Sequence, residues 1–568
     1  MRKTFMLILL ATAMSCGSRD PILTRLEERL KSVVDLGRPD PTRDDVQQAL
    51  TQQLRVTPVP VTGGAKGANP VFPTRETLTK FYSSNGHRLA WCDPSGEILP
   101  TAKSLLETLR RSGEHGLAPE DYALGRLDFL AARIGKPAPD EDLAARLADF
   151  DLLMTAAFLR YASDLSSGRV HPDEVRDDWH TNPPELDLLS GLEQALKGGS
   201  LPKLLEALPP PHTGYERLRK ALKDLRDIEA AGGWPKIPEG PELKPGSRGP
   251  RVALLRQRLS GDAGQTDADA GELYDGALAD SVRHFQEHHG LQPDGKLGAA
   301  TLAELNRPVG WRIRQVELNL ERYRWIPRQL GDPHVLVNIP GFHLELARGG
   351  ASVWSTRIVV GKALKPTPVF SDNIVAIVAN PPWNVPESIA LGEYLPELRD
   401  DPKAFERHGL RILEGTGEDA QEVKPSKVDW DEIGDGKFPY HLRQDPGPEN
   451  ALGRVKFHLT NEYNIYLHDT PARSLFGQAD RDLSHGCIRV EKPLELAGLL
   501  LGDSARDELR EALETTEERH IPVKPQVPIH ILYLTAWADQ SGQLRFGQDV
   551  YELDGPQRTA LDRVTTSR

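Results

Sequence analysis

The feature that most constrains the fold is a change in the spacing of apolar residues near residue 330. Upstream, long stretches such as Leu143–Ala162 repeat with the period of an amphipathic helix. Downstream, short segments such as Val335–Pro340 and Val353–Val360 alternate as strands do, between turn-forming residues. At 568 residues the chain is also too long for one domain. We therefore expect a helical part followed by a mostly β part built on an antiparallel sheet or sandwich.

Composition excludes two classes of protein. A net charge of -13 argues against a nucleic-acid binder, because neutralising phosphates needs clustered lysine and arginine. The chain has only three cysteines, Cys16, Cys92 and Cys487, so a disulfide framework is excluded, although a single bridge from Cys92 to another thiol stays open. We expect no nucleic-acid partner.

The first residues have the pattern of a processing segment. Arg2 and Lys3 precede the apolar run Phe5–Ala13, which is too short to span a bilayer. The run ends at Cys16 in Ala-Met-Ser-Cys, which resembles a bacterial lipobox, although an ordinary secretory signal cut nearby is the alternative. The resemblance implies a signal peptide over 1–15, lipidation of Cys16 and a membrane anchor. Because Gly17 follows the cysteine, we expect a lipoprotein on the periplasmic side of the cell envelope, with the outer membrane favoured.

One stretch of the β part combines a thiol with two imidazoles. His468 ends the run Asn464–His468, whose alternation places Tyr466 and His468 on one face. The tetrapeptide Ser484–Cys487, Ser-His-Gly-Cys, supplies a thiol in a glycine-containing turn whose N–H groups can face a reacting carbonyl. A cysteine nucleophile needs such an oxyanion site and a base. A cysteine beside a histidine can also be a buried small hydrophobe next to a satisfied polar group.

The whole arrangement resembles the YkuD-type L,D-transpeptidase motif: an upstream His, a gap, then Ser/Thr-His-Gly-Cys, an apolar residue and Arg or Asn. The resemblance implies Cys487 as nucleophile and His468 as base, oriented by the backbone carbonyl of Asp469 rather than by its carboxylate. His485 would mainly shape the turn, and Gly486 would leave N–H groups free for the oxyanion. Arg489 would bind a substrate carboxylate, or else form a structural ion pair. Further candidates for substrate contact are Ser484, Tyr466, Asn384 and Trp383, the last of which could equally be a core residue.

Other segments resemble parts of the larger YcbB-type members of this family. The turn Asp-Gly-x-Leu-Gly-x-x-Thr at 294–301, among three short helical patterns, resembles a peptidoglycan-binding module. Its His284, His288 and His289 are expected on a solvated face. The segment 387–448 is polar, interrupted by Pro and Gly and poor in strand pattern, and we expect a capping insert over the catalytic cleft.

The expected fold class is therefore multidomain α+β. It comprises a helical scaffold domain, a three-helix peptidoglycan-binding module and a mostly β catalytic domain with an inserted capping subdomain. The predicted boundaries are 1–15 for the signal peptide, 16–73 for N-terminal helices and linker, 74–235 for the scaffold, 241–307 for the module, 311–555 for the catalytic domain and 556–568 for a C-terminal tail.

The family resemblance also implies the substrate. A tetrapeptide stem with a diamino acid at position three, such as meso-diaminopimelate, would acylate Cys487 as D-Ala leaves, and an amine of a neighbouring stem would complete a 3→3 cross-link. Lipoprotein attachment, D-amino acid exchange and L,D-carboxypeptidase activity would share the first half-reaction. Carbapenem-type inhibitors are expected, while partner cell-wall synthases stay open.

Two other classes of function are weaker alternatives. A zinc hydrolase would need ligands drawn from His458, His468, His485 and Cys487, whose spacing matches no standard ligand set. A non-catalytic peptidoglycan-binding anchor would have no need of the intact cysteine motif. We expect no cofactor and no metal.

Overall fold

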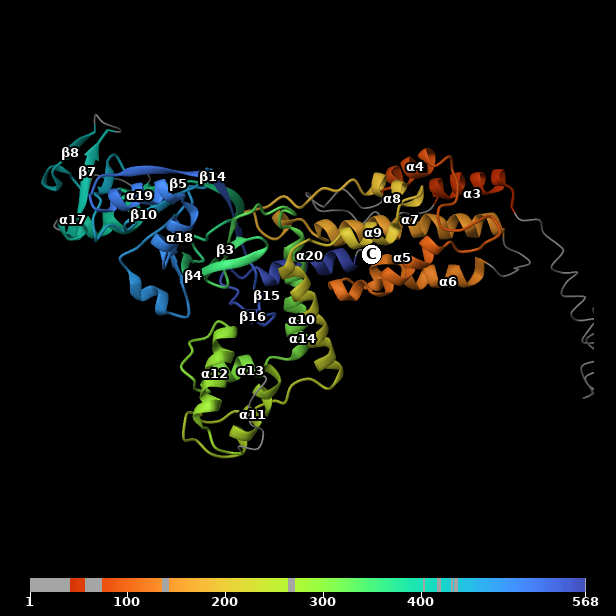
Figure 1. Cartoon of the computed structure of the whole chain (residues 1–568), viewed down its shortest axis with the longest axis horizontal. Helices are drawn as coiled ribbons and strands as arrows, with labels where there is room; N and C mark the ends of the chain where they lie inside the picture. The colour runs from red at the N-terminus through yellow and green to blue at the C-terminus, as the bar shows by residue number, and fades with distance from the viewer. Residues whose placement is uncertain are drawn as a thin grey trace, which may run out of the picture.

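The computed structural model describes residues 41–56, 74–134, 142–263, 271–401, 404–415, 420–430, 433 and 438–566. The predicted signal peptide and Cys16 lie outside these ranges. The described chain has a helical arm at one end, a β-rich domain at the other and a small helical module beside their junction (Figure 1). No helix within the described ranges combines the length and apolarity needed to cross a membrane.

The helical arm is built around one long helix, α7 (Leu143–Ser167), which is buried along most of its length. It ends where Gly168 takes φ +94, a conformation that side chains rarely adopt. The Asp151 carboxylate in its middle accepts the N–H of Trp91 at 2.7 Å and the hydroxyl of Tyr82 at 2.7 Å, which ties the 82–91 segment to the helix. The surrounding helices are α3 (Arg43–Val56), α4 (Arg75–Ser84), α5 (Pro100–Arg110), α6 (Leu124–Ile134), α8 (Leu188–Leu196) and α9 (Leu201–Ala207).

Two helices that are distant in sequence, α10 (Thr213–Ala230) and α14 (Val309–Arg324), pack together at the junction of the arm and the β domain (Figure 1). Between them in sequence lies the three-helix module, α11 (Pro250–Ala263), α12 (Gly276–His288) and α13 (Ala299–Leu305). The three predicted helices of the module are confirmed.

The expectation of a solvated histidine face on this module is wrong. His288 is only 8% exposed. The ring of His289 stacks on Phe285 at 3.8 Å and lies 5.2 Å from Phe546 of β16 (Leu544–Phe546). These histidines therefore lie where the module meets a hairpin of the β domain, a neighbour that local sequence does not reveal.

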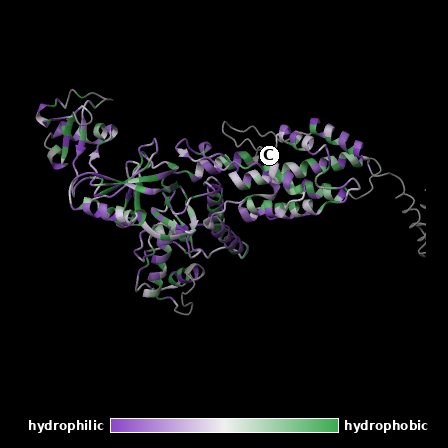
Figure 2. Cartoon of the chain, turned by 45° about the horizontal axis from the view of Figure 1, so that its top comes forward, coloured by the Kyte–Doolittle hydropathy of each residue, from purple (hydrophilic) through white to green (hydrophobic). Residues whose placement is uncertain are grey.

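The β domain is a mixed sheet that closes on itself. Its strand order is β1-β5-β10-β11-β13-β4-β3-β2-β14, and β14 also pairs with β5. The strands are β1 (Trp179–His180), β2 (His334–Asn338), β3 (His343–Arg348), β4 (Ala351–Gly361), β5 (Val369–Ala379), β10 (Val455–His458), β11 (Leu467–His468), β12 (Asp482–Ser484, paired with β4), β13 (Ile488–Val490) and β14 (Arg519–Leu532). Apolar residues concentrate along these strands (Figure 2). Helices α18 (Pro493–Leu500) and α19 (Asp503–Leu513) add to the same core.

The insert folds as a separate small unit with its own apolar core, and it contains short strands that its sequence pattern did not indicate. Its sheet has the order β6-β9-β7-β8, from β6 (Trp383–Asn384), β9 (His441–Gln444), β7 (Leu410–Glu414) and β8 (Gln421–Val423). Its helical segments are α15 (Glu387–Ile389), η5 (Ala390–Tyr394), α16 (Leu395–Asp400) and α17 (Ala404–Arg407). Strands of two to five residues are too short to show a clear alternation.

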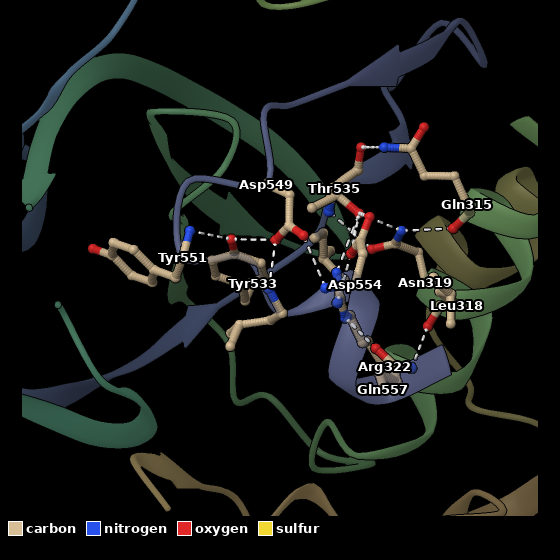
Figure 3. Close-up of polar contacts among 12 residues, drawn as sticks. Gln315, Leu318, Asn319, Arg322, Tyr533, Thr535, Asp549, Tyr551, Asp554 and Gln557 are labelled. Carbon is tan, nitrogen blue, oxygen red and sulfur yellow. Dashed lines mark hydrogen bonds and ion pairs between the residues drawn. The ribbon is translucent and has the colours of Figure 1, made fainter. Parts of the chain in front are cut away.

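A buried polar network joins α14 to the C-terminal end of the chain (Figure 3). Arg322, whose side chain is 1% exposed, lies 2.7 Å from the Asp554 carboxylate and donates to Gln557 at 2.8 Å. Thr535, just after β14, donates its hydroxyl to Asp554 at 3.0 Å. Asp554 begins helix α20 (Asp554–Thr566), so the segment predicted as a C-terminal tail is largely a helix, with Leu561 buried in the main core.

This network predicts a large stability effect. Asp554→Ala leaves Arg322 as an unpaired buried charge, so we expect the free energy of unfolding to fall by roughly 3–5 kcal/mol. The measurement is the shift, in calorimetry, of the unfolding transition of the domain that contains this network. Asp507→Ala is the control, because it removes the partner of the exposed Arg510 and should change stability by less than about 1 kcal/mol. Equally small effects of the two substitutions would contradict the prediction.

Candidate active site

The site is built on one parallel strand pair. β11 and β13 pair in the register Leu467 with Ile488 and His468 with Arg489. Paired residues point to the same face of a sheet, and alternate residues along a strand share a face. Cys487 immediately precedes β13 and is therefore level with Tyr466, on the face that carries His468 and Arg489. The predicted base and nucleophile come from adjacent strands, as the sequence pattern indicated.

His468 is held in a defined tautomer. Its Nδ1 lies 2.5 Å from the backbone carbonyl oxygen of Asp469. A carbonyl only accepts, so Nδ1 carries the hydrogen and Nε2 of the neutral ring is free to take a proton. The Asp469 carboxylate instead accepts the N–H groups of Arg454 and Thr470. The orienting group is thus the carbonyl, which the family resemblance implied.

The site contains a neutral base rather than a charged one. Burial, followed by the charges of Arg489 and Lys456, lowers the pKa of His468 to about 3, against the opposing hydrogen bond to Asp469. Burial also raises the pKa of the Cys487 thiol. Neutral imidazole and protonated thiol are therefore the resting forms near neutral pH.

The Cys487 thiol donates to the Asn464 carbonyl oxygen at 3.7 Å. Other groups on the same face stabilise the thiolate once it forms. Polar groups of Tyr466 and the charges of Lys456 and Arg489 each act to lower the pKa of the Cys487 thiol. Lys456 is in register with His468, and its ammonium lies 4.0 Å from the centre of the Tyr466 ring. Each of these groups opposes the effect of burial on the thiol.

Arg489 has the features of an anion-binding residue. It is half-buried, its Nε makes no hydrogen bond, and no described carboxylate forms an ion pair with it. Burial lowers its pKa. The alternative of a structural ion pair finds no partner within the described residues.

Two predicted residues shape the turn Ser484–Cys487, which we call the catalytic turn. Ser484 is 2% exposed. Its hydroxyl donates to the Cys487 carbonyl oxygen at 2.6 Å and accepts the Gly486 N–H at 3.2 Å. Gly486 takes φ +112, which explains why glycine occupies this position. Ser484 is directed at the backbone of the turn.

His485 points toward the insert. Its Nε2 contacts the carboxylate of Glu393, from η5, and lies 3.4 Å from the Lys362 ammonium. Trp383 and Asn384 belong to the sheet of the insert, where Trp383 pairs with Gln444 and its half-buried ring lies 6.3 Å from that of Tyr394. The insert therefore contacts the catalytic turn through Glu393.

Sequence reasoning did not single out Lys456, Lys362 or Glu393. Lys456 had a signal, since it alternates with the core residues Val455 and Phe457 along one strand. Its place opposite His468 depends on strand register, and Glu393 is brought in by the fold of the insert. Within the described part of the chain, no three His, Cys, Asp or Glu side chains could hold a metal ion.

Comparison with protein families identifies three of the domains. Residues 332–524 match the L,D-transpeptidase catalytic domain of the YkuD family. Residues 76–222 match the scaffold domain, and 248–305 match the "Putative peptidoglycan binding domain". The chain thus combines a YkuD-type L,D-transpeptidase catalytic domain with a scaffold and a peptidoglycan-binding domain, the YcbB-like architecture.

A curated relative carries a related name. A Haemophilus influenzae protein called "Putative L,D-transpeptidase" is 36% identical over 245 residues, which cover 42% of this chain and 48% of that protein. The chain therefore spans about half the length of that relative.

Solved structures of L,D-transpeptidases were also matched. The match to one from Xylanimonas cellulosilytica covers 52% of this chain and 98% of the chain in that structure, at 14% identity and a TM-score of 0.17. One from Stackebrandtia nassauensis covers 52% and 96%, at 14% identity and a TM-score of 0.22.

The electrostatics of the site predict the pH dependence of thiol alkylation. Because burial raises the pKa of Cys487, the rate with iodoacetamide should rise with a midpoint above that of an ordinary cysteine. Arg489→Gln and Tyr466→Phe should each move the midpoint higher, because each removes a group that stabilises the thiolate. The exposed Arg506→Gln should leave it unchanged. A wild-type midpoint below the ordinary value would indicate a resting thiolate–imidazolium pair and contradict this prediction.

Proposed function

We propose that this chain is an L,D-transpeptidase that forms 3→3 peptidoglycan cross-links through a thioester on Cys487. The observation that carries the proposal is the single sheet face that holds Cys487, neutral His468 and Arg489, which has no ion-pair partner among the described residues. A thiol nucleophile, a base and an anion-binding group are the parts that acyl transfer from a peptide stem requires.

The first half-reaction is acylation. The Cys487 sulfur attacks the carbonyl carbon of the diamino acid while His468 Nε2 accepts the thiol proton. The carbonyl oxygen becomes an oxyanion beside the backbone N–H of Cys487, since the Gly486 N–H donates to the Ser484 hydroxyl. When the tetrahedral intermediate collapses, the bond to D-Ala breaks, and His468 returns the proton to the amine of the departing D-Ala. The product is a thioester.

The second half-reaction transfers the acyl group. The side-chain amine of a neighbouring diamino acid attacks the thioester carbonyl and loses a proton to His468. The carbon–sulfur bond breaks, the sulfur regains its proton and the two stems are joined. Water as acceptor would give a carboxypeptidase, and a free D-amino acid would give exchange.

Arg489 fits a stem carboxylate in this scheme. An N⁺–H···O⁻ hydrogen bond is stronger than a neutral one, and among the described residues this guanidinium has no ion-pair partner that a substrate would have to displace. A bound carboxylate would also offset the positive charge that lowers the pKa of His468. Substrate binding would thereby make His468 a stronger base when it is needed.

The other domains support the same substrate class. A peptidoglycan-binding module would hold the enzyme near its substrate and raise the local concentration of stems. The insert lies against the catalytic turn through Glu393 and would limit access of water to the thioester.

The proposal predicts a defined product pattern. Purified protein incubated with disaccharide-tetrapeptides should release D-Ala and form 3→3 dimers, read by mass spectrometry. Cys487→Ala should abolish both products, and Cys92→Ala, a buried cysteine of the helical arm, should abolish neither. A carbapenem should leave a stable adduct on Cys487. D-Ala release without dimers would overturn the cross-linking proposal in favour of exchange or carboxypeptidase activity.

We also propose that the protein is anchored in the cell envelope, on the periplasmic side, through lipidated Cys16. The support is the lipobox-like pattern before this cysteine. Wild-type protein expressed in a Gram-negative cell should fractionate with membranes, and Cys16→Ala should move it to the soluble periplasmic fraction. Wild-type protein found wholly in the soluble fraction would contradict the anchor.

A further inference from the structure

A threonine outside the catalytic motif contacts the backbone of the catalytic turn. Thr367 lies in the loop between β4 and β5 and is 1% exposed. Its hydroxyl donates to the Gly486 carbonyl oxygen at 2.6 Å and accepts the Gly361 N–H at 2.9 Å. The hydroxyl therefore joins the end of β4 to the turn that carries Cys487.

A tyrosine from the C-terminal segment holds this threonine in place. The Tyr551 hydroxyl accepts the Thr367 N–H at 3.1 Å and donates to the Gly361 carbonyl oxygen at 2.6 Å. Burial raises the pKa of Tyr551 to about 12, so the hydroxyl remains a donor. Gly361, Thr367 and Tyr551 thus form a closed ring of hydrogen bonds.

Tyr551 is itself fixed by the buried network at the end of the chain (Figure 3). Its N–H donates to the Tyr533 hydroxyl at 2.9 Å, and that hydroxyl donates to Asp549 at 2.7 Å. Residue 551 lies beyond the matched catalytic domain, which ends at 524. The C-terminal segment of this chain therefore supports the catalytic turn directly.

Peptide geometry links this support to the chemistry. The Gly486 carbonyl and the Cys487 N–H belong to one planar peptide, and in a trans peptide they point in opposite directions. Since Thr367 holds the carbonyl oxygen, the N–H is directed away from Thr367. Among the described residues, the Cys487 N–H has no hydrogen-bond acceptor. It is therefore available to an oxyanion formed at the neighbouring sulfur.

Close packing leaves this peptide little room to rotate. A Cβ added to Gly361 would lie 2.2 Å from the Lys365 carbonyl oxygen and 2.9 Å from the Gly486 Cα. The end of β4, the loop after it and the catalytic turn are thus in direct contact. Of the groups in this contact, the Thr367 hydroxyl is the one that bonds to the Gly486 carbonyl.

We propose that Thr367, held by Tyr551, is a positioning residue that orients the Cys487 N–H as an oxyanion donor. This inference rests on the proposed acyl-transfer function. It assigns the loop after β4 and the segment around residue 551 a part in acylation beyond packing.

Two reagents separate this role from a general structural one. A carbapenem acylates the thiol through an oxyanion, whereas iodoacetamide alkylates it by displacement at carbon and forms none. In the whole chain, Thr367→Val should slow carbapenem acylation about 10- to 100-fold. This is less than the roughly 100- to 1,000-fold loss for removing an oxyanion donor, because the Cys487 N–H is misaligned rather than removed. The alkylation rate should stay within about 3-fold of wild type, which is a small change compared with the expected loss of acylation rate. Tyr551→Phe should shift the same ratio in the same direction.

Controls distinguish the possible outcomes. Thr367→Ser keeps the hydroxyl and should restore acylation, while Thr559→Val removes an exposed hydroxyl that bonds to a helix carbonyl and should change neither rate. Unchanged acylation in Thr367→Val and Tyr551→Phe would overturn the inference, as would a parallel loss of both reactions. Wild-type protein that is alkylated but not acylated would overturn the proposed function itself, and the positioning role with it.

Discussion

The active site depends on the parallel pairing of β11 with β13. That register brings His468 beside Arg489 and Cys487 level with Tyr466 on one face. The opposite face carries Leu467, Ile488 and Val490, all fully buried in the main core. A one-residue slip would exchange the two faces, so burial of these side chains, about 1.5–3 kcal/mol each, also maintains the catalytic geometry.

Arg322 and Arg489 differ in whether the structure places an anion beside the guanidinium. Arg322 is surrounded by Asp554, Gln557 and Thr535, so its charge is matched and its role is to join α14 to the C-terminal helix. Arg489 has no described anion beside it, and with Lys456 it lowers the pKa of the neighbouring His468. An unmatched, partly buried charge destabilises the empty site, and binding of an anion relieves that penalty.

Local patterns in the sequence predicted the elements whose signals are long or specific. These include the helix over Leu143–Ala162, the three helices of the small module and the strands that flank the motif. The strands of the insert were not predicted because they are very short. The surroundings of His289 were not predicted because Phe546, which lies near its ring, is distant in sequence. Closure of the sheet was not predicted either, because it depends on strands distant in sequence: β14 pairs with both β2 and β5.

The sequence by itself determined the chemistry available: a thiol in a glycine turn, a histidine at the end of a strand and an arginine two residues beyond the cysteine. Those are local properties of side chains and of strand alternation. Only the tertiary structure decided which groups surround them, because register and long-range packing bring Lys456, Thr367 and Glu393 to the site from distant segments. It also decided the protonation states, since burial lowers the pKa of His468 and raises that of Cys487.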